Sequence, residues 1–479
     1  MEKKANKNLI VFIATVLIIT AAVIAVAVLP NIQKKPVNPD NCQHTFIETE
    51  NEAADEFTPG KITYKCSKCN EEKTERINAL GKMPQIYFDG SIQGIGKDSD
   101  VLVKVEYTDE VQSFDSYATI KYQGHTAMLY DKKNFTVKFY KDENKEEKNK
   151  ISLNGWKESN KYCLKANYID FSQSRNIISA NIWTDVVNTR KNLNANIADL
   201  QYYGAIDGYP IMVFINDEYQ GVYTMNIPKD DDTYNIGDDE NEALFVINSP
   251  NSRSAHFKAN LTDEDKKNIF DLEYCYGEDD GNTEWAYDSL DNLISFVMKN
   301  DGDDFKSGIG KYLDVDSAID YLVTAYYLGL TDNFAKNVLM LTYNGEQWIL
   351  SLYDLDTAFG LAFDATKIYE PDYQLPKRSS DGTLTSSTGS LLWDKLLINY
   401  YDEIRTRYIE LRKSVLINDD VIKRYDAFIK VIPKNFYDKD LEIWGDIPLN
   451  KENNVNQMKD YLNKRSKLLD EFFEYKQGG

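Results

Sequence analysis

The chain has 479 residues, more than one small domain needs and enough for a two-lobed enzyme with an additional module. Its formal net charge is −22, which argues against nucleic acid as a partner, because phosphate backbones bind basic faces. The apolar fraction of 42% is ordinary and supports a substantial core.

The first predicted element is an uncharged run from Leu9 to Leu29, long enough for a helix that crosses a hydrocarbon core. A slight excess of lysines before it favours a cytoplasmic tail over residues 1–8. We therefore expect a single-pass anchor in the cell membrane, a linker over 30–41 and an extracellular main domain. A cleaved signal peptide is the alternative, although its apolar stretch is normally shorter.

A small Cys/His module is predicted over residues 42–82. Cys42, His44, Cys66 and Cys69 form a CxH…CxxC pattern, and thiolates with an imidazole suit tetrahedral Zn²⁺. The intervening residues are polar and too few for a core, so a metal would supply the missing stability. Four ligands leave no open position, which favours a zinc-ribbon-like spacer. Free or oxidised cysteines are the alternative.

The next part of the chain, about 83–255, is predicted to be rich in β-strands. Short runs with many β-branched and aromatic residues indicate strands at 101–107, 117–124, 134–140 and 161–168. A helix over Asp170–Val187 follows, with isoleucines on one face, and then a hairpin over 208–227.

From about residue 260 the pattern becomes helical. Apolar residues at helical spacing predict a helix over 313–330, and three or four amphipathic helices over 391–475. Between them, VLMLTY and QWILSLYD read as the two arms of a hairpin joined by a turn at NGE.

That hairpin carries the residues that point to chemistry. Asp332 and Asn337 lie in the loop before it, and Asp354 and Asp356 lie directly after it. The returning strand brings the second pair back toward the first, so an acid, an amide and further acids can converge. Phosphoryl transfer needs such a set, because an aspartate orients the attacking hydroxyl and oxygen ligands hold Mg²⁺. Protein kinases use the same order, although the usual histidine and arginine before the first aspartate are absent here.

Five segments in order resemble the CotH-type spore-coat protein kinases, an atypical, secretory-kinase-like family. The resemblance covers about residues 84–475, and the segments are IKYQGHTAMLYDKKNFTVKFY, NYIDFSQSRN, VFINDEYQGVYTM, TDNFAKN and YDLDTAFG. It implies that Asp332 is the catalytic aspartate, that Asp354 is the principal metal ligand, and that Asn337 and Asp356 are secondary ligands or supports.

The nucleotide phosphates need cations as well. Lys138 follows the turn at Gly124 and matches the family pattern best, while Lys165 in YCLKA is similar to the strand lysine of protein kinases. Either can reach the phosphates. Arg175, at the start of the predicted helix, can bind phosphate or pair with an acid.

The resemblance implies an α+β, two-lobed, protein-kinase-like fold. Its β-rich N-lobe would span about 83–255 and its helical C-lobe about 260–479, preceded by the transmembrane helix and the Cys/His module. It implies transfer of the ATP γ-phosphate to Ser/Thr hydroxyls of a surface or spore-coat protein, with Mg²⁺ or Mn²⁺, in a Gram-positive-type bacterium.

Two alternatives remain open. Asn226 stands where the family usually has a glutamate, so the chain can instead be a weak or inactive kinase-like scaffold or adhesion protein. The sequence DLD also fits the metal-binding DxD of nucleotide-sugar transferases. That fold needs alternating strands and helices before the acids, whereas successive strands and hairpins precede them here.

Overall fold

The computed structural model describes residues 42–124, 126–236, 239–278, 281–445, 447 and 449–476. The chain divides into two compact units, Met1–Gly81 and Lys82–Gly479.

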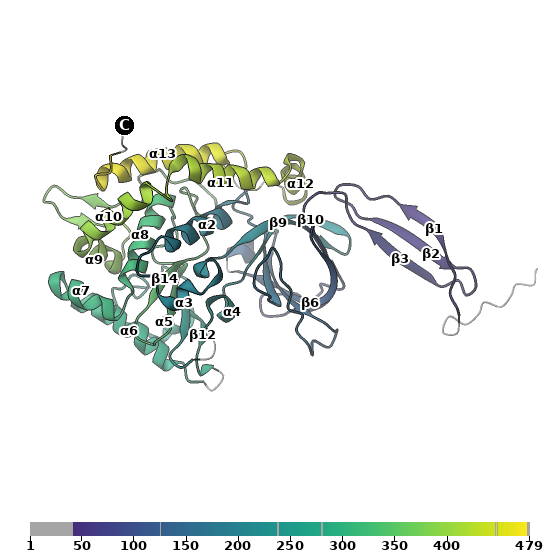
Figure 1. Ribbon diagram of the computed structural model, residues 1–479, viewed down its shortest axis with the longest axis horizontal. Coiled ribbons are helices and arrows are strands. Elements are labelled where there is room, and N and C mark those ends of the chain that lie inside the picture. The colour runs from purple at the N-terminus through teal and green to yellow at the C-terminus, as the bar shows by residue number, and fades with distance from the viewer. Residues whose placement is uncertain are drawn as a thin grey trace, which may run out of the picture. The chain divides into compact units, whose positions relative to one another are not determined.

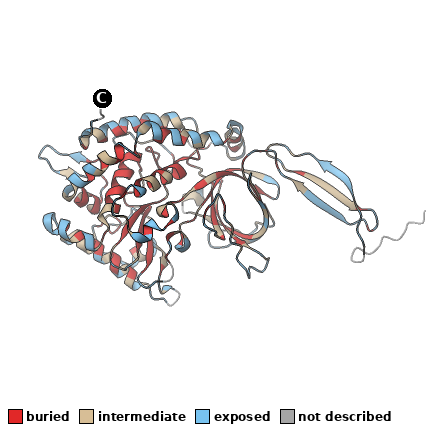
Figure 2. Cartoon of the chain, viewed as in Figure 1, coloured by how far each residue is buried: buried red, intermediate tan, exposed pale blue. Residues whose placement is uncertain are grey.

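The first unit contains a three-stranded antiparallel sheet in the order β1-β2-β3. Its strands are β1 (Phe46–Glu52), β2 (Gly60–Cys66) and β3 (Glu72–Ile77). Most side chains of β1 and β3 are exposed, and the buried apolar side chains of residues 42–81 are only Cys66, Cys69 and Ala79. Figure 2 shows the same scarcity of buried residues in this sheet. Residues 42–81, the described part of this unit, therefore have almost no hydrophobic core.

The second unit begins with a closed barrel in the strand order β10-β8-β7-β6-β5-β4-β9 (Figure 1). Its strands are β4 (Gln85–Asp89), β5 (Val101–Thr108), β6 (Ser113–Gln123), β7 (Asn134–Tyr140), β8 (Lys161–Lys165), β9 (Gly208–Ile215) and β10 (Glu218–Asn226). Neighbours pair antiparallel except β4 and β9, which pair in parallel. The short 3₁₀ segment Thr126–Leu129 follows β6.

Alternation along the barrel strands explains its two faces. Residues such as Ile120, Val137 and Leu164 are fully buried and fill the interior, because every second side chain of a strand points the same way. On β6, β7 and β8 the residues between them are mostly polar, and Thr119, Lys138 and Lys161 lie side by side on the outer face. The sequence thus places apolar side chains inside the barrel and a polar wall outside it.

The rest of the second unit is mainly helical and contains its own antiparallel sheet, in the order β12-β11-β13-β14. That sheet consists of β11 (Ala243–Ile247), β12 (Phe270–Cys275), β13 (Val338–Thr342) and β14 (Ile349–Leu352), and a small hairpin pairs β15 (Lys377–Arg378) with β16 (Leu384–Thr385). The helices before β13 are α2 (Arg175–Asn188), α3 (Ala195–Ala198), α4 (Asp231–Tyr234), α5 (Asp263–Asn268), α6 (Glu284–Lys299), α7 (Gly302–Gly308) and α8 (Val315–Leu328), with 3₁₀ segments at Gln201–Gly204 and Ile309–Lys311. The later helices are α9 (Leu391–Asn399), α10 (Tyr401–Arg412), α11 (Asn418–Val431), α12 (Lys434–Trp444) and α13 (Val455–Phe472).

The centre of this region is α8, whose residues from Ser317 to Leu328 are all buried. Helices α2, α10 and α13 and strand β14 pack around it. The Trp183 indole of α2 donates to the Ser351 hydroxyl of β14 at 3.1 Å. Figure 2 shows the buried residues concentrated in these inner elements, with exposed residues on the outer faces of α6, α7 and α13.

The fold class predicted from the sequence is corrected by this architecture. The unit is α+β, but its first strands close into a barrel, and the predicted hairpin joins β11 and β12 in a four-stranded sheet that was not expected. The parallel pairing of β4 with β9, more than 120 residues later in the sequence, closes the barrel. Local periodicity carries no information about such a distant partner.

The predicted transmembrane helix is not supported either. In the part of the chain that the structure describes, no helix is both long enough and apolar enough to cross a membrane. The apolar run Leu9–Leu29 itself lies outside the described residues.

A buried ion pair joins the barrel to α12. The Lys132 ammonium lies 2.7 Å from the Asp440 carboxylate and donates to the Val222 carbonyl at 2.6 Å, while Asp440 accepts from the Val222 N–H at 3.0 Å. Burial lowers the pKa of Lys132 and raises that of Asp440, although each charge favours the other's ionised form. The bulge at Gly221, with φ of 100°, leaves room for Asp440, since a Cβ there would lie 2.2 Å from its Oδ1.

We expect Asp440→Ala to destabilise the protein by about 3–5 kcal/mol, because it leaves the Lys132 ammonium buried without a countercharge. Urea unfolding measures the loss. The control is Asp438→Ala on the same helix, whose carboxylate faces Lys434 at 3.4 Å with both side chains largely exposed. An unchanged unfolding midpoint for Asp440→Ala would contradict the structural role assigned to the pair.

Candidate functional site

A cavity of about 400 Å³ lies between the outer polar face of the barrel and the ends of the strands of the second sheet. This size is in the range of small-molecule and cofactor sites. Although the protein is strongly acidic, eight lysines and six acidic residues line this cavity. They are Lys97, Lys121, Lys132, Lys138, Lys161, Lys165, Lys229, Lys336, Asp98, Asp271, Glu273, Asp332, Asp354 and Asp356. Separate groups of cations and anions suit an anionic ligand that arrives with a metal ion.

The barrel supplies most of the cations through its strand register. Lys138 of β7 lies opposite Thr119 of β6 and Lys161 of β8, and Lys165 lies four residues further along β8, so these side chains share one face. The pKa of Lys138 is lowered by burial and by the nearby charges of Lys161 and Lys121. This wall therefore carries positive charge that an anion would stabilise.

The acidic wall is built by the β13–β14 hairpin and the loop before it. Val338 pairs with Leu352, so Asn337 before β13 and Asp354 after β14 lie at the same end of the hairpin. The Asn337 side-chain amide donates to Asp332 Oδ2 at 3.4 Å, and the Asn337 N–H donates to the Ile247 carbonyl at 2.7 Å. The structure thus brings together the acid, the amide and the second acid.

The segment from Leu330 to Asp356 carries Asp332, Asn337, Asp354 and Asp356 and is called the acidic loop here. The backbone fixes both of its ends. Gly329 ends α8 in a left-handed conformation with φ of 62°, and a Cβ there would lie 2.5 Å from the Tyr461 ring, so the residue must be glycine for the chain to turn toward Asp332. After β14, Asp354 adopts φ of 55°, and the next N–H, from Leu355, donates to the Asn176 side chain at 2.9 Å.

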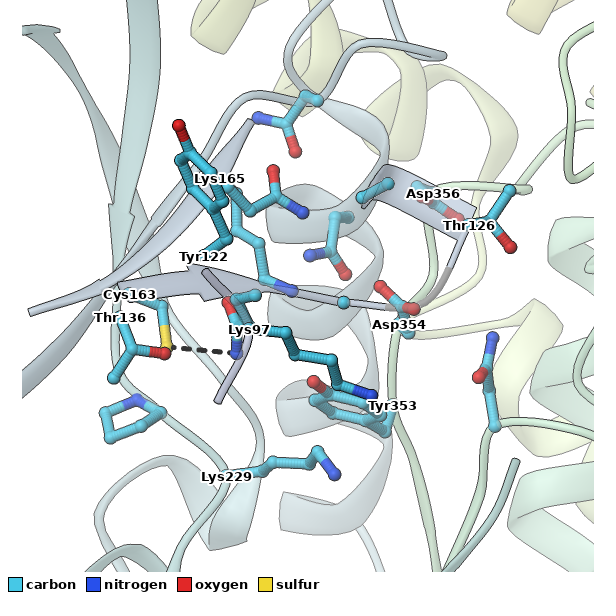
Figure 3. Close-up of a pocket in the computed structure, with 18 of the residues that line it drawn as sticks. Lys97, Tyr122, Thr126, Thr136, Cys163, Lys165, Lys229, Tyr353, Asp354 and Asp356 are labelled. Carbon is cyan, nitrogen blue, oxygen red and sulfur yellow. Dashed lines mark hydrogen bonds between the residues drawn. The ribbon is translucent and has the colours of Figure 1, made fainter. Parts of the chain in front are cut away.

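The carboxylates repel one another. The pKa of Asp356 is raised well above its ordinary value by burial and by the charges of Asp354 and Asp332. The pKa of Asp332 is raised by burial and by Asp354, against the opposing effect of Lys336. Figure 3 shows Asp354 and Asp356 on the wall opposite the barrel, with Lys165 reaching into the cavity from the barrel side. Carboxylate and amide oxygens in this arrangement fit Mg²⁺ or Mn²⁺.

The predicted nucleotide-binding residues divide into two groups. Gly124, Lys138 and Lys165 line the cavity. Arg175 does not; its guanidinium is fully buried, lies 3.4 Å from Asp170 and donates to Asn453, Gln457 and the Ala358 carbonyl. Arg175 therefore fixes the segment after the acidic loop against α2 and the start of α13, and it has no access to a bound phosphate.

Asn226 also lies away from the cavity lining. It is buried at the end of β10, opposite Cys163 and Gly208, and one atom of its side-chain amide lies 2.9 Å from the Thr224 hydroxyl oxygen. A polar partner within its own strand accommodates this residue where the family usually has a glutamate.

Two features of the cavity were missed by the sequence analysis. Lys336 lies 2.6 Å from Asp332 Oδ2 and 5.6 Å from the centre of the half-exposed Phe363 ring. Elsewhere in the cavity, Lys229 pairs with Glu273 and lies over the Tyr353 ring. The spacing of Asp332 and Lys336 by four residues was a usable signal, since both fall within the TDNFAKN segment. Nothing in the sequence links Lys229 to Glu273.

In the first unit, the four predicted zinc ligands converge. One ligand atom from each of Cys42, His44, Cys66 and Cys69 lies within 4.8 Å of the others. The Cys42 and Cys66 sulfurs are 3.8 Å apart, and Cys69 Sγ lies 3.3 Å from His44 Nδ1.

Comparison with known proteins gives one match of long extent. The family model described as CotH kinase protein matches residues 120–469, which covers most of the second unit, including the cavity and the acidic hairpin. The chain belongs to the CotH kinase family. No curated protein matches it.

Membership of the CotH kinase family confirms the resemblance found in the sequence and implies a kinase-like function. It also indicates ATP, a divalent metal and a protein substrate as the components of the reaction. The cavity contains groups suited to the first two, since lysines and carboxylates oppose each other across it.

Because burial and repulsion raise the pKa of Asp356, neutralising this side chain is expected to stabilise the folded protein. Because the folded-state pKa of Asp356 lies above its unfolded-state value, its ionised form opposes folding above the folded pKa, and this cost vanishes below the unfolded pKa. We expect Asp356→Asn to raise the Tm of the metal-free protein at about pH 8 and to have little effect at about pH 3.

Calorimetry in EDTA measures this difference. The control is Asp364→Asn, because the pKa of Asp364 is lowered by its hydrogen bonds to Thr366, so its neutralisation brings no gain. A lower Tm for Asp356→Asn at about pH 8 would show that the carboxylate is not under the repulsion described.

Proposed function

We propose that the protein is a metal-dependent kinase that transfers the γ-phosphate of ATP to Ser or Thr hydroxyls of a protein substrate. The observation that carries this proposal is the convergence of Asp332, Asn337 and Asp354 in one cavity, facing a wall of lysines. Family membership supports the kinase class, and the geometry supports the assignment of roles within it.

The acidic loop fits two tasks. Asp354, Asn337 and Asp356 offer oxygen ligands to Mg²⁺ or Mn²⁺, which when bound neutralises the developing charge on the phosphates. Asp332 accepts the proton of the acceptor hydroxyl as its oxygen attacks the γ-phosphorus. The bond from that phosphorus to the β–γ bridging oxygen breaks, and ADP leaves.

Lys336 determines which oxygen of Asp332 performs this task. Its ammonium and the Asn337 amide both contact Oδ2, at 2.6 and 3.4 Å, so Oδ1 is the oxygen without these contacts. A carboxylate held by one oxygen presents the other in a fixed direction, which is what an orienting base requires. The same ammonium is close enough to Asp354 and Asp356 for their charges to raise its pKa.

The barrel wall fits the nucleotide phosphates. Lys165 faces the acids, because its positive charge opposes the rise in the pKa of Asp356. Gly124 and Thr126 also line the cavity. Lys138, beside Lys161, stands further from the acids along the strands and fits a different part of the ligand.

The first test is phosphorylation. With Mg²⁺ or Mn²⁺ and labelled ATP, we expect the protein to label itself or a general acceptor such as casein. Asp354→Asn is expected to lower the rate at least about 10³-fold through loss of the metal, and Asp332→Asn about 10²–10⁴-fold through loss of the base.

The two variants also differ in binding. Asp332→Asn is expected to retain a nucleotide-induced thermal shift with Mg²⁺, whereas Asp354→Asn loses it, and Asp364→Asn serves as the unaffected control. No labelling and no nucleotide-induced shift with any cation would leave the scaffold as the better description. Labelling from a nucleotide-sugar would favour the transferase.

The second test concerns Lys336. Since its charge lowers the pKa of Asp332, Lys336→Met is expected to move the acidic limb of the kcat/KM profile to higher pH and to lower kcat about 10²-fold. Lys336→Arg retains the charge and is expected to restore much of the profile. A uniform loss of rate with an unshifted limb would show that Lys336 acts only on folding or on substrate binding.

A further inference from the structure

The Cys/His cluster of the first unit has no role in the kinase chemistry proposed above. Its four ligand atoms come from two segments, the strand entry at Cys42 and His44 and the β2–β3 turn at Cys66 and Cys69. The turn is tight, with the Asn70 N–H donating to the Cys66 carbonyl at 3.0 Å and Asn70 in the left-handed region at φ of 64°. This turn is what places the two CxxC sulfurs side by side.

Backbone contacts hold the two segments together. The Ser67 N–H donates to the Thr45 carbonyl at 3.0 Å, and the Lys68 ammonium donates to the Gln43 carbonyl at 2.8 Å. The N–H groups of Thr45 and Lys68 both point at the Cys66 sulfur, at 3.5 Å. Hydrogen bonds of this type surround and orient sulfur ligands in metal sites.

The distances fit a tetrahedral metal and do not fit a disulfide. Four ligands at zinc bond lengths place two sulfurs about 3.8 Å apart, and a sulfur and a nitrogen about 3.5 Å apart. The observed separations are 3.8 Å for Cys42 and Cys66 and 3.3 Å for Cys69 Sγ and His44 Nδ1. A disulfide bond requires about 2.05 Å.

One further group orients the histidine. His44 Nε2 lies 3.3 Å from the Glu71 carboxylate, while Nδ1 faces Cys69. A ligating histidine commonly donates its other ring N–H to a carboxylate, which fixes the tautomer and the ring orientation. Glu71 lies two residues after Cys69, so the same turn supplies two ligands and this partner.

We propose that Cys42, His44, Cys66 and Cys69 bind one structural Zn²⁺, with His44 ligating through Nδ1 and Glu71 holding its Nε2–H. Three thiolates and one imidazole match the ligand preference of zinc. Four protein ligands fill the tetrahedron, so the ion has no open position for a substrate or an activated water. It replaces the missing core, because among residues 42–81 little is buried outside the cluster apart from Ala79.

The experiment uses the full chain, dialysed against excess Mg²⁺ so that the acidic loop of the second unit does not retain zinc. Mass spectrometry of the metal content is expected to give about one zinc per chain. Cys66→Ser and Cys69→Ser are expected to lose it, and Cys275→Ser, a buried thiol of the second unit, to keep it. Wild-type protein without zinc, or with a Cys42–Cys66 disulfide or iron in the site, overturns the proposal.

Two measurements test the orientation of His44. In the ¹¹³Cd-substituted, ¹⁵N-labelled protein, scalar coupling is expected at His44 Nδ1, and coupling at Nε2 overturns the assignment. Glu71→Gln is expected to weaken zinc binding about 10–100-fold in competition with a chelator while the stoichiometry stays at one. Unchanged affinity would exclude Glu71 as the partner of the ligating histidine.

Discussion

The register of the β13–β14 hairpin sets the relative positions of Asp332, Asn337, Asp354 and Asp356 in the cavity. With Val338 opposite Leu352, the loop before β13 and the turn after β14 meet at one end of the sheet. A shift of one residue would turn each side chain of the strand to the other face and separate Asp354 from Asn337. The register is protected because both strands are fully buried and β13 also pairs with β11.

The barrel supplies the positive charge that faces these acids. Its strands alternate between an apolar interior and a polar exterior, and the exterior of β6 to β8 is rich in lysine. The cavity therefore lies between a cationic wall and an anionic wall on a protein that is acidic as a whole. An anion accompanied by a divalent cation neutralises both walls at once, whereas neither ion alone does so.

The sequence predicted local structure well and long-range closure poorly. The strand runs became β5 to β8, and the hairpin after the loop at Asp332 appeared as predicted, because both follow from short-range alternation. The barrel was not predicted, since it depends on the pairing of β4 with β9. Arg175 illustrates the same limit within the site: its charge suggested phosphate, but its partner Asn453 lies 278 positions away. Lys336 was missed although its spacing from Asp332 was visible.

The contact between the barrel and α12 has a consequence for synthesis of the protein. Asp440 follows Lys132 by 308 positions, so at ordinary translation rates it leaves the ribosome about 15–60 s later. Until then Lys132 has no carboxylate partner for burial, and β10 lacks the helix that covers its bulge. All strands of the barrel are made by Asn226, but Lys132 and the β10 bulge stay without their α12 partner until the tail of the chain has been made. A chain released after Phe363 but before Lys434 contains every residue that lines the cavity but lacks the helix that covers the β10 bulge.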